Sequence, residues 1–175
     1  MKELKTIFAY CLSVFFLFLD GQLSLFSGYL LPTPYSFTTF IWLLWGMMLL
    51  RESSIQKVLL WSILFGFLFD LIYLQIAGVT VFILPILLLL AFYYLNTFSF
   101  NMLSFGLVSL VLIFFFEGLL LTASFFLEGA RDYIWFTMIT HFFPTIVVNY
   151  GLSFVVYVIY SRMFKKDRHL IVKKA

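Results

Sequence analysis

Apolar residues fall into six runs along the chain, and short polar segments separate them. About 20 residues of α-helix span roughly 30 Å of hydrocarbon, so each run has about the length of a membrane crossing. Their approximate bounds are 7–26, 37–50, 58–74, 77–95, 103–126 and 133–160. The second run is the shortest, and the sixth is interrupted by His141, Pro144 and Asn149. The pattern predicts six transmembrane helices.

Glycine, proline, charged and other polar residues mark the breaks between these runs. The breaks lie at about 28–34, 51–54, 75–78, 96–101 and 128–132. Such short connections make consecutive helices antiparallel neighbours. Because there is no internal repeat or linker, we expect residues 1–175 to form a single integral-membrane domain, a compact all-α bundle.

The composition excludes a water-soluble protein. Of the 175 residues, 64% are apolar and 11% are charged, and the mean hydropathy is +1.10. A soluble domain has about 45–50% apolar and about 25% charged residues, so this chain cannot cover itself with polar surface. No run alternates with a period of two over the length of a barrel strand, which disfavours a transmembrane β-barrel.

The basic residues predict the orientation. If both termini lie on one side of the membrane, ten of the eleven Lys and Arg residues lie on that side, and Arg131 is the exception. Because Lys and Arg are concentrated in cytoplasmic segments, we expect both termini in the cytoplasm. The basic tail from Arg162 to Lys174 either contacts anionic membrane lipids or docks to an acidic partner. We favour lipid contact, since a positive cytoplasmic end is usual.

Four ionisable residues lie inside the predicted spans, namely Asp20, Asp70, Glu117 and His141. A charged side chain at the membrane centre costs roughly 2.5–3.5 kcal/mol on insertion scales, so such residues usually face a partner, a cavity or the bundle interior. The helical rise places Asp70 about 7–8 Å, and His141 about 10–12 Å, from the outer ends of their spans. We expect all four residues in one layer in the outer half of the membrane.

This polar layer has four interpretations. It could be structural, with Asp70 accepting a hydrogen bond from His141 or a tyrosine. It could receive a donor from another protein's helix, enclose a ligand cavity open to the outside, or carry out catalysis. Hydrogen bonds between membrane helices contribute only about 0.6 kcal/mol on average, so stability alone is a weak reason to keep these groups.

Catalysis has the least support among these interpretations. The sequence contains no HExxH zinc motif and no phosphate-binding glycine loop. Nothing around Ser124 and His141 indicates a serine-protease arrangement, and nothing places Asp20 beside Asp70 as an acidic pair. We expect no enzymatic activity, no cofactor, no metal and no nucleic-acid binding.

Small and helix-breaking residues accompany the polar layer. Gly66 precedes Asp70 by one helical turn on the same face, where it lets a neighbouring backbone approach the carboxylate. Gly78 permits the turn that follows. We expect Pro144 to kink the sixth span and Asn149 to link two helices. Structural and functional interpretations of these residues remain equally open.

Two segments carry a resemblance to a known family. Gly66-Phe67-Leu68-Phe69-Asp70, followed by seven residues and Gly78, resembles the G-x3-D-x7-G signature of the MreD family. Pro144-Thr145-Ile146-Val147-Val148-Asn149 resembles the late P-T-x3-N segment of that family, and Pro32-Thr33-Pro34-Tyr35 precedes an aromatic second span in the same way. Asp20, Glu117 and His141 match no family motif.

The resemblance implies a non-enzymatic, multi-pass protein of the bacterial plasma membrane that takes part in cell-wall elongation. Such a protein binds MreC, which has a single span and a large extracytoplasmic domain. The resemblance also implies association with MreB, a SEDS glycosyltransferase and a class B penicillin-binding protein during peptidoglycan synthesis and control of cell shape. The family's fold is similar to the substrate-binding subunits of energy-coupling-factor transporters, so binding of a vitamin is the alternative function.

We therefore expect a lipid-facing surface around Gly66 and Asp70 to hold the transmembrane helix of MreC. This hypothesis treats Asp70 as an acid that has no partner in its own chain.

Overall fold

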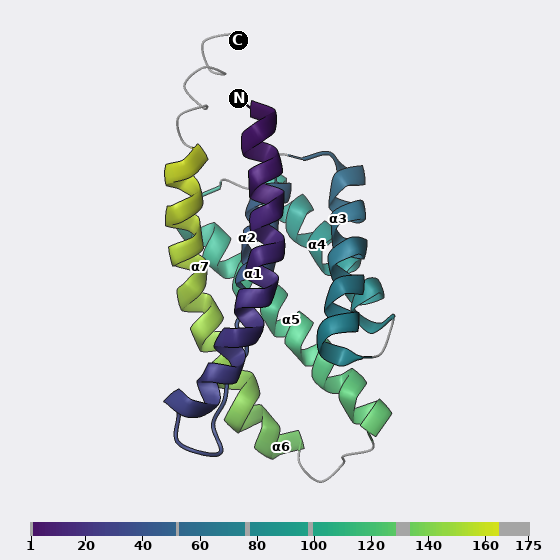
Figure 1. Cartoon of the computed structure of the whole chain (residues 1–175), viewed down its shortest axis with the longest axis vertical. Coiled ribbons are helices and arrows are strands. Elements are labelled where there is room, and N and C mark those ends of the chain that lie inside the picture. Colours follow the sequence, from purple (N-terminus) through teal and green to yellow (C-terminus); the bar gives the residue numbers. More distant parts are fainter. Residues whose placement is uncertain (1, 52, 76–77, 98–99, 129–133, 165–175) are drawn as a thin grey trace.

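Helices form all the regular secondary structure of residues 2–51, 53–75, 78–97, 100–128 and 134–164, which are the residues that the computed structural model describes (Figure 1). The α-helices are α1 (Lys2–Leu30), α2 (Ile41–Leu50), α3 (Ile55–Phe69), α4 (Val79–Thr97), α5 (Met102–Glu128), α6 (Ile134–Thr137) and α7 (Phe143–Phe164). Two π-helical segments, η1 (Asp70–Leu74) and η3 (Met138–Phe142), follow α3 and α6. Arg131 and most of the predicted basic tail, from residue 165 onward, lie outside the described residues.

Five helical stretches are long and apolar enough to cross a membrane. They are Phe8–Leu30, Ile55–Leu74, Val79–Thr97, Met102–Ser124 and Trp135–Met163. This confirms the predicted all-α class and five of the six predicted spans in length and composition. The start of α1 and the end of α7 lie at the same end of the bundle (Figure 1).

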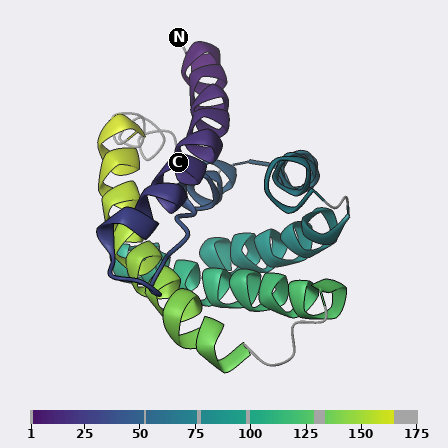
Figure 2. The same ribbon diagram turned by 60° about the horizontal axis from the view of Figure 1, so that its bottom comes forward.

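The predicted second span differs from the structure. Only Ile41–Leu50 is helical in this region, and ten residues of α-helix cover about 15 Å, or half of the hydrocarbon thickness. Nine of these ten residues are buried. The helix packs against α1, α4 and α7, with the longer helices grouped around it (Figure 2). Residues 36–40, which precede it, are not helical. We call them the extended segment 36–40 because their N–H groups alternate in direction, as described below, up to Phe40, whose ψ of 46° leads into α2.

The extended segment 36–40 takes its hydrogen-bond partners from the helices beside it. The bonds run from Ser36 N–H to Thr140 O (3.0 Å), Phe37 N–H to Ser27 Oγ (3.2 Å), Thr38 N–H to Thr145 Oγ1 (3.0 Å), Thr39 N–H to Ser24 Oγ (3.2 Å), and Phe40 N–H to Asn149 Oδ1 (2.7 Å). The N–H groups point alternately to α1 and to the η3–α7 side, as extended backbone requires. Every N–H in the segment is thereby satisfied.

Pro144 explains why one of these partners is available. A proline inside a helix has no N–H, so the carbonyl four residues earlier loses its usual donor. That carbonyl belongs to Thr140, and it accepts the Ser36 N–H instead. The helical hydrogen-bond pattern changes at the same place, because η3 ends at Phe142 and α7 begins with the next residue. The kink predicted from Pro144 is therefore a π-helical turn directly before it.

Asp70 connects α3 to α4, and the hypothesis that it lacks a partner in its own chain is wrong. Its carboxylate accepts the backbone N–H groups of Gly78 (2.8 Å), Thr80 (2.9 Å) and Val81 (3.3 Å). These groups belong to the first turn of α4 and the residue before it, where N–H groups have no partner within the helix. Asp70 is fully buried, so it caps α4 from the preceding helix.

Gly66 and Gly78 complete this hairpin. A Cβ atom on Gly66 would lie 2.9 Å from the carbonyl oxygen of Thr80, so the α4 backbone packs where a side chain would be. Gly78 has φ of 112°, a conformation that other residues rarely adopt. The three residues of the G-x3-D-x7-G segment therefore form one structural unit.

The role of Asn149 in holding the extended segment can be tested by substitution. Its side chain accepts the Phe40 N–H and donates to the carbonyl oxygens of Thr38 (2.7 Å) and Thr145. Asn149→Ala leaves buried backbone groups without partners, and we expect the free energy of unfolding in detergent to fall by about 1–3 kcal/mol. The control is Asn96→Ala, since Asn96 is exposed and donates only to Phe92 O in its own helix. Equal stability of the two variants would contradict the assignment.

The close approach of α3 and α4 gives a second prediction. Gly66→Ala places a methyl group against Thr80 O, and we expect it to destabilise the protein by about 1–3 kcal/mol because the two helices must separate. Gly151→Ala is the matched control, since an added Cβ there meets nothing within 4 Å. The control should be neutral or stabilising, because alanine favours the helix by up to about 1 kcal/mol. Thermal unfolding of both purified variants measures the difference.

Candidate functional site

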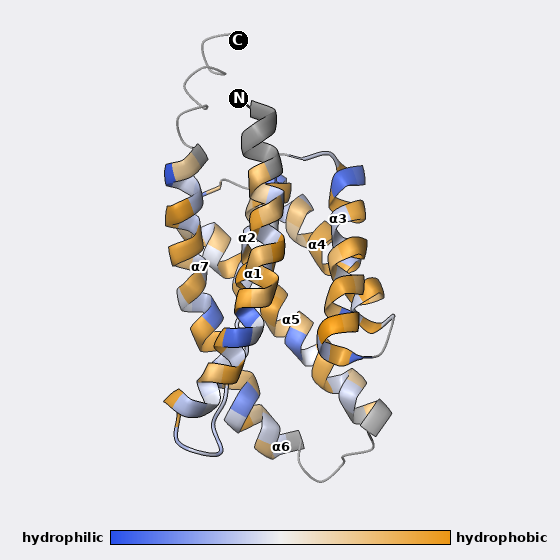
Figure 3. Ribbon diagram, in the orientation of Figure 1, coloured by the Kyte–Doolittle hydropathy of each residue, from blue (hydrophilic) through white to orange (hydrophobic). Residues whose placement is uncertain are grey.

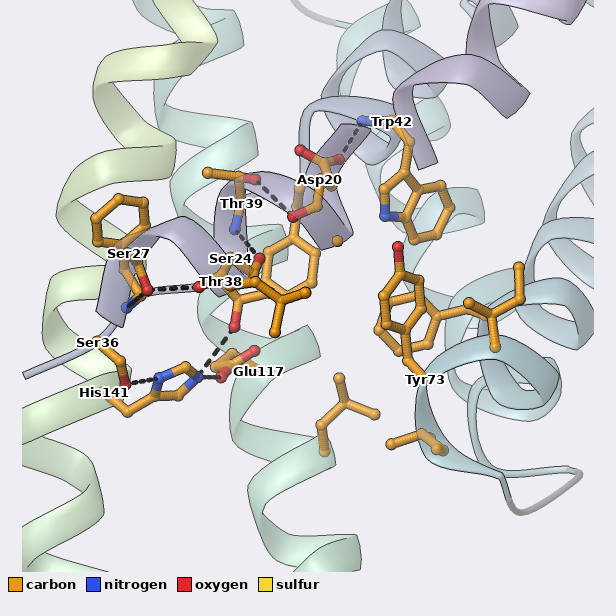
Figure 4. A pocket seen from close by; sticks show the side chains of 18 of the residues that line it. Asp20, Ser24, Ser27, Ser36, Thr38, Thr39, Trp42, Tyr73, Glu117 and His141 are labelled. Carbon is orange, nitrogen blue, oxygen red and sulfur yellow. Dashed lines mark hydrogen bonds and ion pairs between the residues drawn. The ribbon is translucent and has the colours of Figure 1, made fainter. Parts of the chain in front are cut away.

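Three of the four ionisable residues predicted inside the membrane line one cavity. They are Asp20 of α1, Glu117 of α5 and His141 of η3, which Figure 4 shows together. The cavity has a volume of about 700 Å³, within the range of sites that bind small organic molecules. Hydrophilic residues of several helices lie in the half of the bundle remote from the start of α1 (Figure 3). Asp70 does not line the cavity, because its carboxylate is bound to α4.

Irregular backbone surrounds the cavity on three sides. The extended segment 36–40, η1 and η3 all contribute lining residues. Non-helical backbone at membrane depth is tolerated only where it is buried in protein or lines a cavity, and π-helical turns are frequent at functional sites. Aromatic rings make up much of the wall, from Phe18, Phe37, Phe40, Trp42, Phe69 and Tyr73.

Glu117 and His141 lie against each other in the cavity wall, where they form an ion pair when the imidazole is protonated. His141 Nε2 lies 3.2 Å from Glu117 Oε1, and the two side chains are 30% and 10% exposed. The imidazole is also held by the extended segment, since Ser36 Oγ lies 2.9 Å from Nδ1 and Thr38 Oγ1 lies 3.1 Å from Nε2. The structural interpretation predicted a hydrogen bond from His141 to Asp70, whereas in the structure the partner of His141 is Glu117. Such pairing offsets part of the cost of placing charged groups in the membrane.

Asp20 supplies the other carboxyl group of the cavity. Its Oδ2 accepts the backbone N–H of Trp42 at 2.9 Å, in the first turn of α2. The N-cap residue of α2 makes no side-chain cap, so Asp20 caps this helix from α1. Its Oδ1 atom has no hydrogen-bond partner among the residues that the structure describes, although the residue is only 3% exposed. One carboxylate oxygen of this lining residue is therefore buried without a hydrogen-bond donor among the described residues.

Tyr73 connects η1 to α1 by a hydrogen bond. Its hydroxyl donates to the carbonyl oxygen of Leu17 at 2.6 Å. A Cβ atom on Gly21 would collide with this hydroxyl, so the glycine provides the space for it. Tyr73 lines the cavity, and sequence reasoning did not identify it. A tyrosine near the end of an apolar run is typical of a membrane-interface residue, so the sequence pattern does not distinguish this role.

The serine and threonine residues that hold the extended segment were also missed. A signal for the segment itself was its cluster of hydroxyl residues, Ser36, Thr38 and Thr39, which is unusual at the start of an apolar span. The hydrogen bonds that hold the segment involve the predicted residue Asn149 and the carbonyl freed by Pro144. They also involve Ser24, Ser27 and Thr145, which were not predicted.

The chemistry available in the cavity is that of recognition by acidic acceptors and aromatic faces. Ser124 and His141 both line it, but the Ser124 hydroxyl donates to Leu121 O at 2.9 Å. Both imidazole nitrogens of His141 have the partners given above. Within the described part of the chain, no group of three His, Cys, Asp or Glu side chains is placed to hold a metal ion.

Comparisons with known proteins leave the family of this chain open. No family model, curated protein or solved structure matches it. The function has to be argued from its own residues and from the resemblance of its two short segments.

Proposed function

We propose that the protein is a non-enzymatic scaffold subunit of the bacterial cell-wall elongation complex that resides in the plasma membrane and binds MreC. The observation that carries this proposal is the local structure of the segments that resemble the MreD family. Gly66, Asp70 and Gly78 form one capped hairpin, and Thr145 and Asn149 hold one extended segment. A motif that specifies a fold should bring its residues together in this way, whereas a chance match in composition need not.

The proposal includes six membrane crossings with both termini in the cytoplasm. The crossing between α1 and α3 combines the extended segment 36–40 with the short helix α2. The basic residues at the start of the chain and near Arg51, together with the common end of α1 and α7, support this orientation. The cavity then belongs to the outer half of the membrane, toward the domain of MreC.

Helix α1 offers the most suitable surface for the single span of MreC. Exposed residues recur along it at alternating intervals of three and four: Phe8, Cys11, Phe15, Phe18, Gln22 and Leu25. This spacing is the seam along which two helices pack with a small crossing angle. Since Asp70 and Gly66 are occupied by α4, we place the MreC helix on this seam instead of at the hairpin.

The alternative function is capture of a small molecule, as in the substrate-binding subunit of an energy-coupling-factor transporter. The observation that favours it is the cavity of about 700 Å³, which has the size for a vitamin. Mass spectrometry of the purified protein decides this alternative, because a co-purified vitamin is expected from a tight binder.

Co-purification tests the scaffold proposal. We expect tagged protein, co-expressed with MreC and extracted in mild detergent, to retain MreC. Combining Phe8→Ala with Phe15→Ala should reduce retention at least about fivefold, or ~1 kcal/mol, because the seam loses two large side chains.

The matched control combines Phe82→Ala and Phe115→Ala, which remove two exposed rings from α4 and α5. If the unaltered protein retains no MreC, the scaffold proposal fails. If the seam and control variants retain MreC equally, only the placement on α1 is wrong. Depletion of the protein should also make cells round or lyse.

A further inference from the structure

We propose that the cavity binds an amphipathic organic ammonium compound. The cationic group lies at Asp20, and the apolar part extends between α1 and η1 toward the lipid. The inference does not rest on the scaffold proposal, although Phe18 and Leu25 at the cavity mouth also belong to the α1 seam, so an MreC helix there would lie beside the ligand. It names a ligand class that the alternative function leaves open. Three observations carry it: the charge of the lining, the carboxylate oxygen of Asp20 that has no donor, and the position of the cavity mouth.

The lining favours a cation over an anion. It contains two carboxyl groups, from Asp20 and Glu117, and one imidazole, from His141, but no Lys or Arg. The imidazole is paired with Glu117 at 3.2 Å, so even a protonated His141 is already matched by one carboxylate. The second carboxyl group, that of Asp20, has no basic side chain opposite it in the lining.

Asp20 provides a defined position for the cationic group. Its Oδ2 is engaged by Trp42 N–H, while its Oδ1 has no hydrogen-bond partner within the described ranges. Less than 1 Å² of this oxygen is exposed, so the carboxylate has to turn toward the cavity before an ammonium N–H can donate to it in a charge-assisted hydrogen bond. The Trp42 and Tyr73 rings line the same cavity, and ammonium groups are attracted to the faces of such rings.

The mouth of the cavity faces lipid. The lining residues that are also exposed include Phe18 and Leu25 of α1 and Ile72 and Tyr73 of η1, with exposed fractions of 56%, 71%, 38% and 36%. Phe18 lies twelve residues, or about 18 Å, before the end of α1 at Leu30, so the opening reaches well into the hydrocarbon. A ligand there needs an apolar part, and Tyr73 lies across its path with its hydrogen bond to Leu17 O.

Three matched probes test the ligand class: phenylpropylamine, phenylpropanol and phenylpropanoate. They share one apolar body and differ in the charge of the polar end. In isothermal titration of the full chain in non-ionic detergent, we expect the amine to bind at least about tenfold more tightly than the alcohol and the carboxylate. The amine should also raise the melting temperature the most, because a ligand stabilises the state that binds it.

Asp20→Asn tests the position of the ammonium group. The amide keeps an oxygen for the Trp42 N–H but loses the charge, so the preference for the amine over the alcohol should fall to about twofold or less. Gly151→Ala on the exposed side of α7 is the control and should keep the full preference. Equal binding of amine and alcohol by the unaltered protein, or a full preference in Asp20→Asn, overturns the proposal. The comparison of probes on the unaltered protein stands even if the variant does not fold.

The same titration in nanodiscs identifies the source of the ammonium group. If phosphatidylethanolamine in the disc abolishes phenylpropylamine binding while phosphatidylglycerol does not, the ligand is an aminolipid headgroup. If binding is the same in both discs, the ligand is a free amine. Both results support the ammonium class, and absence of amine binding in both overturns it. MreC retention by the same preparation reports separately on the scaffold proposal.

Discussion

The peptide groups of residues 36–40 must find hydrogen-bond partners inside the protein, and much of the structure follows from this constraint. A helix satisfies its own backbone, but an extended segment in hydrocarbon has neither water nor helical neighbours to do so. Side chains from α1 and α7 therefore meet the segment from two sides, and the carbonyl freed by Pro144 supplies the last partner. These bonds fix the distance between α1 and α7, and they place the short α2 in the centre of the bundle.

The same constraint creates the cavity. A segment that is extended rather than helical brings Ser36 and Thr38 to His141, and it starts α2 where Asp20 can reach the Trp42 N–H. Asp70 and Asp20, both buried, differ in how fully their carboxylate oxygens are hydrogen-bonded. Every oxygen of Asp70 accepts backbone N–H groups of its own hairpin, whereas Asp20 keeps one oxygen without a partner in the described residues. Both acids are buried, so burial does not tell a structural carboxylate from one that could bind a ligand. The number of hydrogen-bond donors around each carboxylate oxygen does distinguish them.

Hydropathy predicted the class of the protein and five of its spans, because lipid selects apolar residues over a fixed length. It could not predict that the second run is half helix and half extended, since hydropathy reports composition and both conformations are equally apolar. The helical rise placed Asp20, Glu117 and His141 correctly in a common region. The rise gives the depth of a residue along the helix axis, but not the side of the helix from which its side chain projects. Asp70 was therefore grouped with them although it faces α4, and Tyr73 was overlooked although it faces the cavity.

The family-like segments and the cavity carry different information about this protein. The residues of the two motifs act within the fold: Gly66, Asp70 and Gly78 join α3 to α4, and Asn149 holds the extended segment. Asp20 and the Glu117–His141 pair belong to no motif of the resemblance, yet they are the ionisable residues that line the cavity. The binding chemistry of this chain is therefore to be sought at the cavity, while Asn149 holds the extended segment that forms part of the cavity wall.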